Sequence, residues 1–333
     1  MQTARVCARE GFEAMDLKQQ LELLLGNFTH LESRLRHLSY DTTACGKRIE
    51  VRCSYVSFQA GVQTIDDFID LLANHIVPFC LPRSAIRHAQ NAIISGDYVT
   101  AGRIASELVN KANALFIKAK KGSHRSGEAA EILLYILNEW ILKAPQIVSK
   151  MYLKTNNNMP VHGTDGIHAR YDEDSKKLYV YWGESKAHKT LNGALDSALS
   201  SIDEFIKDGQ EKREIDIISS YSDLVDIKDE AKKALLDYLD PYSQASLNRV
   251  PCFSCLLIHQ FDHKNDPQLS DEDIEAAYVS AVNASFQAFI DDIKSKIEAK
   301  GLSLRRFEFF LVPVPSAQDF RDKFQAKIGW PND

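Results

Sequence analysis

Three residues between positions 165 and 186 have the types and the spacing that phosphodiester hydrolysis requires. Asp165 is flanked by glycines in an expected turn-to-strand segment, and Glu184 and Lys186 end the next expected strand. Glu184 and Lys186 are two residues apart, so on an extended chain their side chains leave the same face. Carboxylates hold a hard divalent cation, and a lysine beside them can serve the attacking water or the charge that grows on the phosphate. The arrangement favours a metal-dependent nuclease.

Each of these residues also has an ordinary structural interpretation. Glu184 and Lys186 could form an ion pair at the rim of a sheet, worth under about 1 kcal/mol. Asp165 could be a turn residue without chemistry. Trp182 and Gly183 favour the functional interpretation, because the strand before the pair is apolar on both faces and a glycine allows a ligand or backbone to approach closely.

A helix expected from Glu128 to about Lys143 offers a third carboxylate. Glu131 lies beside the apolar stripe of this helix, so its carboxylate can reach the sheet edge. Glu128, three residues earlier on the same side, is the competing candidate. The ordinary alternative for either residue is a solvated helix glutamate.

Four further residues are candidates for contact with substrate phosphates. His188 and Lys189 follow Lys186 closely, and Lys120 and Lys121 belong to the basic segment 111–125. A solvated linker between two helices explains that segment about as well as a phosphate track does.

Other metal and redox chemistries fit the sequence less well. His162, His168 and His188 show no HxxxH or HExxH spacing, and their oxygen-rich surroundings favour Mg²⁺ or Mn²⁺ over zinc. Cys252 and Cys255 have no second pair to complete a zinc site and open an apolar run, so we interpret them as buried strand residues. The other cysteines are scattered along the chain, as is typical of reduced cytosolic thiols.

Composition excludes several classes of protein. The chain has 333 residues, 44% of them hydrophobic, and a formal net charge of −6. No uninterrupted apolar run reaches the roughly 18 residues of a membrane span, and charges in the first twenty residues argue against a secretory signal, so we expect a cytoplasmic protein. No GxxxxGK[ST] motif indicates ATP use. An acidic chain binds DNA poorly by itself, so a nuclease of this charge needs locally concentrated cations or a partner that delivers DNA.

The periodicity of apolar residues predicts an α/β fold with a mixed sheet flanked by helices. Residues 12–38 are expected to be helical with a break near Gly26. Strands are expected at 48–58, on both sides of the turn at 171–177, at 251–261 and at 306–314, and helices at 64–119, 128–143, 190–206, 213–240, 270–299 and 317–328. A composition change near residues 121–126 divides the prediction into a mainly helical N-terminal region, 1–122, and a region with the chemistry, 123–333.

Several motifs between about residues 126 and 206 resemble the HamA family, the nuclease subunits of the Hachiman anti-phage defence system. The resemblance rests on EILLY (131–135), KAPQ (143–146), SKM (149–151), LKT (153–155), MPVHGTDGIH (159–168), WGESK (182–186) and the helix that follows. The family reads GE directly before its ILLY run, whereas this chain has Ala130-Glu131 there and GE at 127–128. We favour Glu131, which keeps its register with the ILLY run.

The resemblance implies a PD-(D/E)xK nuclease core with the order helix, strand, strand, helix, in region 123–333. Asp165, Glu184 and Glu131 would bind Mg²⁺ or Mn²⁺, and Lys186 would be the catalytic lysine. It further implies action on DNA with a superfamily 2 helicase partner, HamB, to which region 1–122 would dock. A non-catalytic adaptor that docks and regulates the helicase, or an RNase on the same scaffold, remains the alternative.

Overall fold

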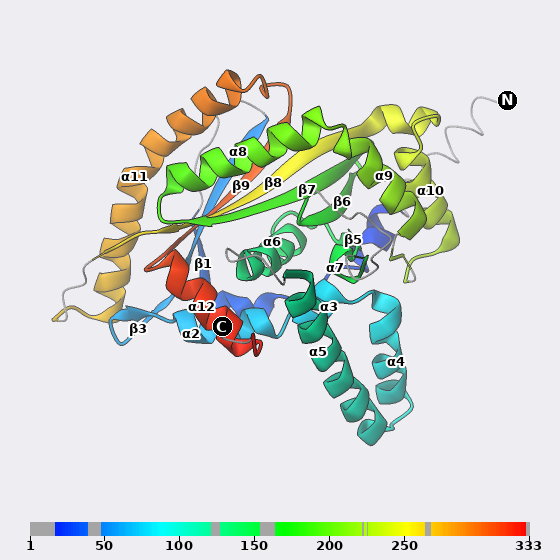
Figure 1. Ribbon diagram of the computed structural model, residues 1–333, viewed down its shortest axis with the longest axis horizontal. Helices are drawn as coiled ribbons and strands as arrows, with labels where there is room; N and C mark the ends of the chain where they lie inside the picture. The colour runs from blue at the N-terminus through cyan, green and yellow to red at the C-terminus, as the bar shows by residue number, and fades with distance from the viewer. Residues whose placement is uncertain are drawn as a thin grey trace.

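The computed structural model describes residues 17–38, 48–120, 127–153, 164–221, 223–224, 226–263 and 268–330. A seven-stranded sheet, in the order β1-β2-β9-β8-β7-β6-β5, runs through these parts (Figure 1). In that order the strands are Leu35–Leu38, Ile49–Val56, Arg306–Val314, Arg249–Gln260, Lys177–His188, Gly166–Asp172 and Gln146–Val148. The four central strands β2, β9, β8 and β7 run parallel, and β1, β6 and β5 pair antiparallel. The predicted mixed sheet is confirmed.

Both faces of the sheet are buried, because its central strands carry apolar residues at odd and even positions alike. Val180, Trp182 and Phe253 point to one face, while Tyr181 and Cys252 point to the other. Each face packs against helices, which gives a layer of helices on either side of the sheet (Figure 1). The buried cysteines 252 and 255 lie in β8 as apolar core residues, as predicted.

One face packs against the helices that lie between β7 and β9 in the sequence. These are α8 (Leu191–Lys207), α9 (Gln210–Tyr221), α10 (Asp229–Leu239) and α11 (Asp271–Ala299). Side chains of Thr190 and Ser270 cap the first turns of α8 and α11.

The other face packs against helices from both ends of the chain. These are α2 (Ile65–Ala73), α3 (Ile76–Cys80), α5 (Tyr98–Lys120), α6 (Glu128–Trp140) and α12 (Ala317–Lys327). Other short elements are α7 (Lys150–Leu153) and a small two-stranded sheet formed by β3 (Phe58–Gln59) and β4 (Val62–Gln63).

The expected helix over residues 12–38 is wrong at its C-terminal end. Residues 17–22 are helical, but a 3₁₀ turn follows at Thr29–Ser33 and then strand β1, Leu35–Leu38. Pairing with β2, from Leu35 opposite Val56 to Leu38 opposite Cys53, overrides the helical periodicity of the segment.

The predicted boundary near residue 122 falls in the range 121–126, outside the described residues. Residues on both sides of it contribute to one sheet, since β2 pairs with β9 from Ile49 opposite Phe307 onward. Leu17 and Leu21 pack in the same apolar cluster as Trp182. Segments before and after the boundary therefore share a core.

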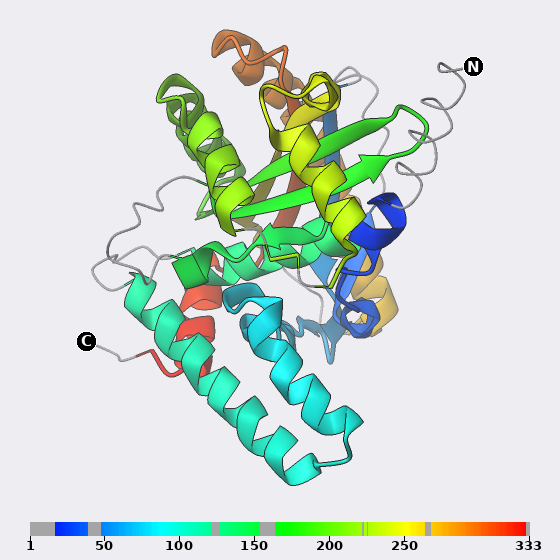
Figure 2. The ribbon, with the colours of Figure 1, turned by 90° about the vertical axis from the view of Figure 1, so that its right-hand side faces the viewer.

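A pair of long helices projects from this body. Helix α4 (Arg83–Ile94) and α5 form a hairpin that extends away from the sheet (Figure 2). Gly96, with φ of +79°, makes the turn between them, a conformation that side-chain-bearing residues rarely adopt. Among the described residues, no helix is both long enough and apolar enough to cross a membrane.

Candidate functional site

The site lies where β7 extends beyond its neighbour β6. Strand β6 begins at Gly166, opposite Gly183, whereas β7 continues to His188 and pairs with β8 over that whole length. The pleat places Glu184, Lys186 and His188 on the same side of β7 as Trp182, whose ring packs against Phe205 of α8. The alternation predicted for Glu184 and Lys186 is thereby present in the structure.

Asp165 immediately precedes β6 and is fixed against β7 at the same point. Its backbone N–H donates to the Gly183 carbonyl at 2.8 Å. Its carboxylate Oδ2 accepts hydrogen bonds from the backbone N–H of Ser185 at 2.8 Å and from the Ser185 hydroxyl at 2.7 Å. Ser185, which the sequence interpretation passed over, thus holds Asp165 beside Glu184 and Lys186.

Glu184 and Lys186 form an ion pair, with Nζ 2.5 Å from Oε1. Glu184 is buried, and burial together with the nearby charge of Asp165 raises the pKa of its carboxyl to about 7. Burial lowers the pKa of Lys186, but the charges of Glu184, Asp165 and Glu131 outweigh it, so this pKa lies above its usual value. The carboxylates of Asp165 and Glu184 are therefore close enough to repel, and the charge of Lys186 is close enough to all three acids to be stabilised by them.

Glu131 reaches the same place from the opposite face of the sheet. It lies in the first turns of α6, where its backbone N–H donates to the Gly127 carbonyl. Its side chain is buried, and its charge acts on Lys186. The side chain of Glu128, the competing candidate, lies outside the described residues.

A cavity of about 630 Å³ opens at this end of β7. Its wall contains five of the residues singled out from the sequence, Glu131, Asp165, Lys186, His188 and Lys189. Glu184 does not line the cavity itself but is paired with Lys186, which does. The remaining lining residues are Gly127, Ser185, Ala187, Ser197, Gln318 and Arg321.

Arg321 and Gln318 are the cavity residues that sequence reasoning missed. They belong to α12, more than a hundred positions away from Lys189, and nothing local in an amphipathic helix marks them out. An arginine three residues after a glutamine on the polar face was the available signal, but it is common on surface helices.

Other predicted residues lie elsewhere or cannot be placed. His168 is buried on β6, where its Nδ1 lies 2.9 Å from the Ala144 carbonyl and its ring packs near Tyr135. Burial lowers the pKa of His168 to about 4, so it is a neutral core residue. His162, Lys121 and the side chain of Lys120 lie outside the described residues.

A buried lysine anchors the segment that leads into Asp165. Lys150 of α7 donates from Nζ to the Thr164 carbonyl at 2.7 Å and to Oε1 of Glu214 at 2.6 Å. Both charged side chains are 1% exposed. Since Thr164 directly precedes Asp165, this α9-to-α7 ion pair fixes the backbone from which the Asp165 carboxylate projects.

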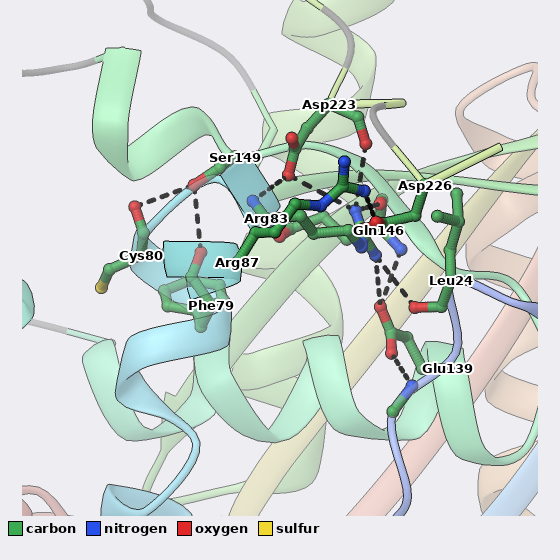
Figure 3. A network of polar contacts seen from close by, with 11 residues as sticks. Leu24, Phe79, Cys80, Arg83, Arg87, Glu139, Gln146, Ser149, Asp223 and Asp226 are labelled. Carbon is green, nitrogen blue, oxygen red and sulfur yellow. Dashed lines mark hydrogen bonds and ion pairs between the residues drawn. The ribbon is translucent and has the colours of Figure 1, made fainter. Parts of the chain in front are cut away.

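A second polar network holds the far end of α6 (Figure 3). Glu139 accepts hydrogen bonds from the backbone N–H groups of Gly26 at 2.8 Å and Gln146 at 2.9 Å. Arg83 lies at the start of α4, with its Nη2 3.7 Å from Oε1 of Glu139. Its guanidinium also donates to the carbonyls of Gln146 and Leu24. The network joins the hairpin, β5 and the helix that carries Glu131.

The donor set suits a hard cation better than zinc. Among the residues that the structure describes, no group of three or more His, Cys, Asp or Glu side chains is arranged to hold a metal ion. Asp165 and Glu184 nevertheless supply carboxylate oxygens whose mutual repulsion a divalent cation would relieve, which fits Mg²⁺ or Mn²⁺. The fit rests on this pair, with Glu131 as a further oxygen donor at the same cavity.

Two comparisons with known proteins complete the description. The family model of HamA matches residues 30–328, which include the whole candidate site. The search of curated proteins finds no match.

Proposed function

Because the chain belongs to the HamA family, and so has a role in anti-phage defence, we propose that it is a metal-dependent deoxyribonuclease. The observation that carries the proposal is the convergence of Asp165, Glu184 and Lys186 at one end of β7, beside a cavity that Glu131 also lines. A divalent cation, when bound, would lower the pKa of a water molecule and offset negative charge on a phosphate.

Asp165 and Glu184 would hold that cation, and Glu131 would add an oxygen from α6. Ser185 keeps the Asp165 carboxylate turned toward the pair through two hydrogen bonds. Lys186 carries a positive charge at neutral pH, because its pKa lies above the usual value. Its ammonium group would orient the attacking water or stabilise the charge that develops on the phosphate.

The proposal includes a PD-(D/E)xK core formed by α6, β6, β7 and α8. The order helix, antiparallel strand pair, helix supports it, as do Asp165 before β6 and Glu184 and Lys186 at the end of β7. We propose DNA as the substrate because a helicase partner, as the family resemblance implies, would deliver it to an acidic chain.

The helicase HamB is the proposed partner, and the tip of the α4–α5 hairpin is its proposed docking site. Four large apolar side chains gather at the two sides of this turn, Ile93, Ile94, Tyr98 and Val99. Ile94 and Val99 are 84% and 86% exposed. The hairpin base is joined to α6 through Arg83 and Glu139, so the docking site is mechanically connected to the helix that carries Glu131.

Degradation of plasmid DNA in Mg²⁺ tests the nuclease proposal, with and without the helicase and ATP. Glu184→Gln and Lys186→Met should each lower the rate by at least about a hundredfold, the usual effect of removing one group that stabilises the transition state. Lys207→Met is the matched control, since Lys207 pairs with Asp203 on the exposed side of α8. EDTA should stop the reaction.

Wild-type rates in the Glu184 or Lys186 variants would refute the assignment. Unchanged phage protection in both variants, with no Mg²⁺ binding by calorimetry, would favour the adaptor instead. Faster cleavage of RNA than of duplex or single-stranded DNA would identify an RNase.

Co-purification with the helicase tests the docking site. Ile94→Asp and Val99→Asp should reduce the recovered partner, because a charge cannot be buried at an apolar contact without a large desolvation cost. Leu304→Asp is the control, as Leu304 is 81% exposed in the turn before β9. Equal recovery with all three variants would place the partner elsewhere.

A further inference from the structure

Helix α12 brings two polar side chains into the cavity beside the carboxylates. Ala317, Phe320 and Phe324 bury one side of this helix, with Phe320 against Phe68 of α2 and Phe324 against Phe116 of α5. Gln318 and Arg321, three residues apart and therefore neighbours on the helix surface, line the cavity. In Figure 1 α12 lies next to α2 and α6. The packed aromatic residues thus fix the helix from which Arg321 projects.

The guanidinium group of Arg321 has N–H donors that its contacts within the described part of the chain do not use. Its Nη2 donates to Oε1 of Gln318 at 2.5 Å, while its Nε is buried and has no hydrogen-bond partner within the described part of the chain. No carboxylate of those residues pairs with it, although Lys323 on the same helix pairs with both Asp66 and Asp319. A buried N–H without an acceptor is unfavourable because it has lost water without gaining a partner, so such a group is a candidate for ligand binding.

The chemistry of the ligand follows from the donor and its surroundings. A guanidinium presents Nε and Nη as a planar fork that matches two oxygens of a phosphate. Lys189 contributes a second cation to the same cavity from beyond the end of β7. The acids Glu131 and Asp165 line the same cavity, so cations and carboxylates share one pocket in a chain whose net charge is −6.

We propose that Arg321, together with Lys189, binds the non-bridging oxygens of a DNA backbone phosphate adjacent to the one that reacts at Asp165 and Glu184. The contact rests on the proposed nuclease function, because it assigns the substrate of the same cavity. Arg321 positions the strand across the site, and Gln318 holds the guanidinium in place through the hydrogen bond to Nη2. A phosphate would satisfy the buried Nε.

Binding of a short fluorescent DNA duplex by the full chain, measured as anisotropy in EDTA, tests this subsite separately from cleavage. Each phosphate contact contributes about 0.9 to the slope of log K against log salt, so Arg321→Ala should reduce the slope by about 0.9 between about 50 and 200 mM salt. The same arithmetic gives a loss of roughly fivefold to tenfold in affinity near 0.1 M salt. Lys189→Ala should act in the same direction.

Lys323→Ala is the matched control, because it removes the same charge from the same helix but from a side chain paired with Asp66. Arg321→Lys keeps the charge without the fork, so it should recover most of the slope and only part of the affinity. A duplex with one neutral methylphosphonate linkage at the contacted position should bind wild type and Arg321→Ala equally.

The outcomes separate the two proposals. Weaker binding by Arg321→Ala, in a protein that proves unable to cut DNA, would support the subsite and overturn the nuclease. Cleavage by the wild type with equal binding by Arg321→Ala and Lys323→Ala would overturn the subsite alone. Tighter binding of an RNA strand than of DNA, or no measurable binding of the duplex by the wild type, would also overturn it.

Discussion

The buried ion pair between Lys150 and Glu214 gives the sharpest test of how Asp165 is positioned. Lys150→Met removes the donor to the Thr164 carbonyl and leaves the Glu214 carboxylate, 1% exposed, without its cation. Breaking a buried pair in this way costs about 3–5 kcal/mol, because the remaining charge stays desolvated. Glu214→Leu should cost a similar amount, because the buried ammonium group of Lys150 loses its carboxylate.

The double variant Lys150→Met/Glu214→Leu should be much less unstable than the sum of the single variants. It removes both charges, and replacement of a buried pair by apolar residues is often close to neutral. One loss remains, since the buried Thr164 carbonyl no longer has its lysine donor, at about 1–3 kcal/mol. We therefore expect a total near that range rather than about 6–10 kcal/mol.

Urea unfolding of the three variants measures these differences as shifts in midpoint at constant slope. The control is Arg103→Met, since Arg103 and Glu107 form an i,i+4 pair in which both side chains are 61% exposed. That substitution should cost no more than about 0.5 kcal/mol. Single variants as mild as this control, or a double variant equal to the sum, would contradict the anchoring role of the pair.

Two further predictions concern packing and protonation. Gly183→Ala should destabilise the fold by about 1–3 kcal/mol. The new Cβ would lie 3.1 Å from Leu134 Cδ2 and 3.4 Å from the Gly166 backbone nitrogen. A urea-unfolding midpoint at or above that of the wild type would contradict this, because it would mean that β6 and α6 shift without loss of stability. Burial raises the pKa of Glu139 from 4.5 to about 7, against the opposing charge of Arg83, so between these pH values the folded state holds a proton that the unfolded state has lost. The free energy of unfolding of the wild type should therefore exceed that of Glu139→Gln most near pH 4.5, and the difference should decline toward pH 7. Urea unfolding of both proteins across that range measures the difference. A difference that is constant or grows with pH would refute the prediction.

Local sequence was sufficient for much of the site because its central residues are neighbours in a strand and a hairpin. Glu184 and Lys186 leave one face by the two-residue repeat of a strand, and Asp165 meets them through the β6–β7 hairpin. Glu131 followed from the apolar stripe of α6, which fixes the side of the helix that faces the sheet.

Residues brought to the site by tertiary packing carried no such signal. Arg321 and Gln318 arrive on a helix from the end of the described chain, and Lys150 and Glu214 look like ordinary surface charges in sequence. Leu35–Leu38 follows the helical repeat but becomes β1 because the edge of β2 is available to it. These residues could not be assigned to the site or to a strand from local sequence, because their partners lie far away along the chain.

The place of β9 between β2 and β8 determines when the central sheet can assemble during synthesis on the ribosome. Until residues 306–314 emerge, β2 and β8 have no strand to join them, so the central sheet stays in two pieces. The cavity wall is incomplete for longer, since Arg321 follows β9. A nascent chain therefore lacks the finished pocket until Arg321 has emerged, and its unpaired strand edges are exposed to aggregation until then.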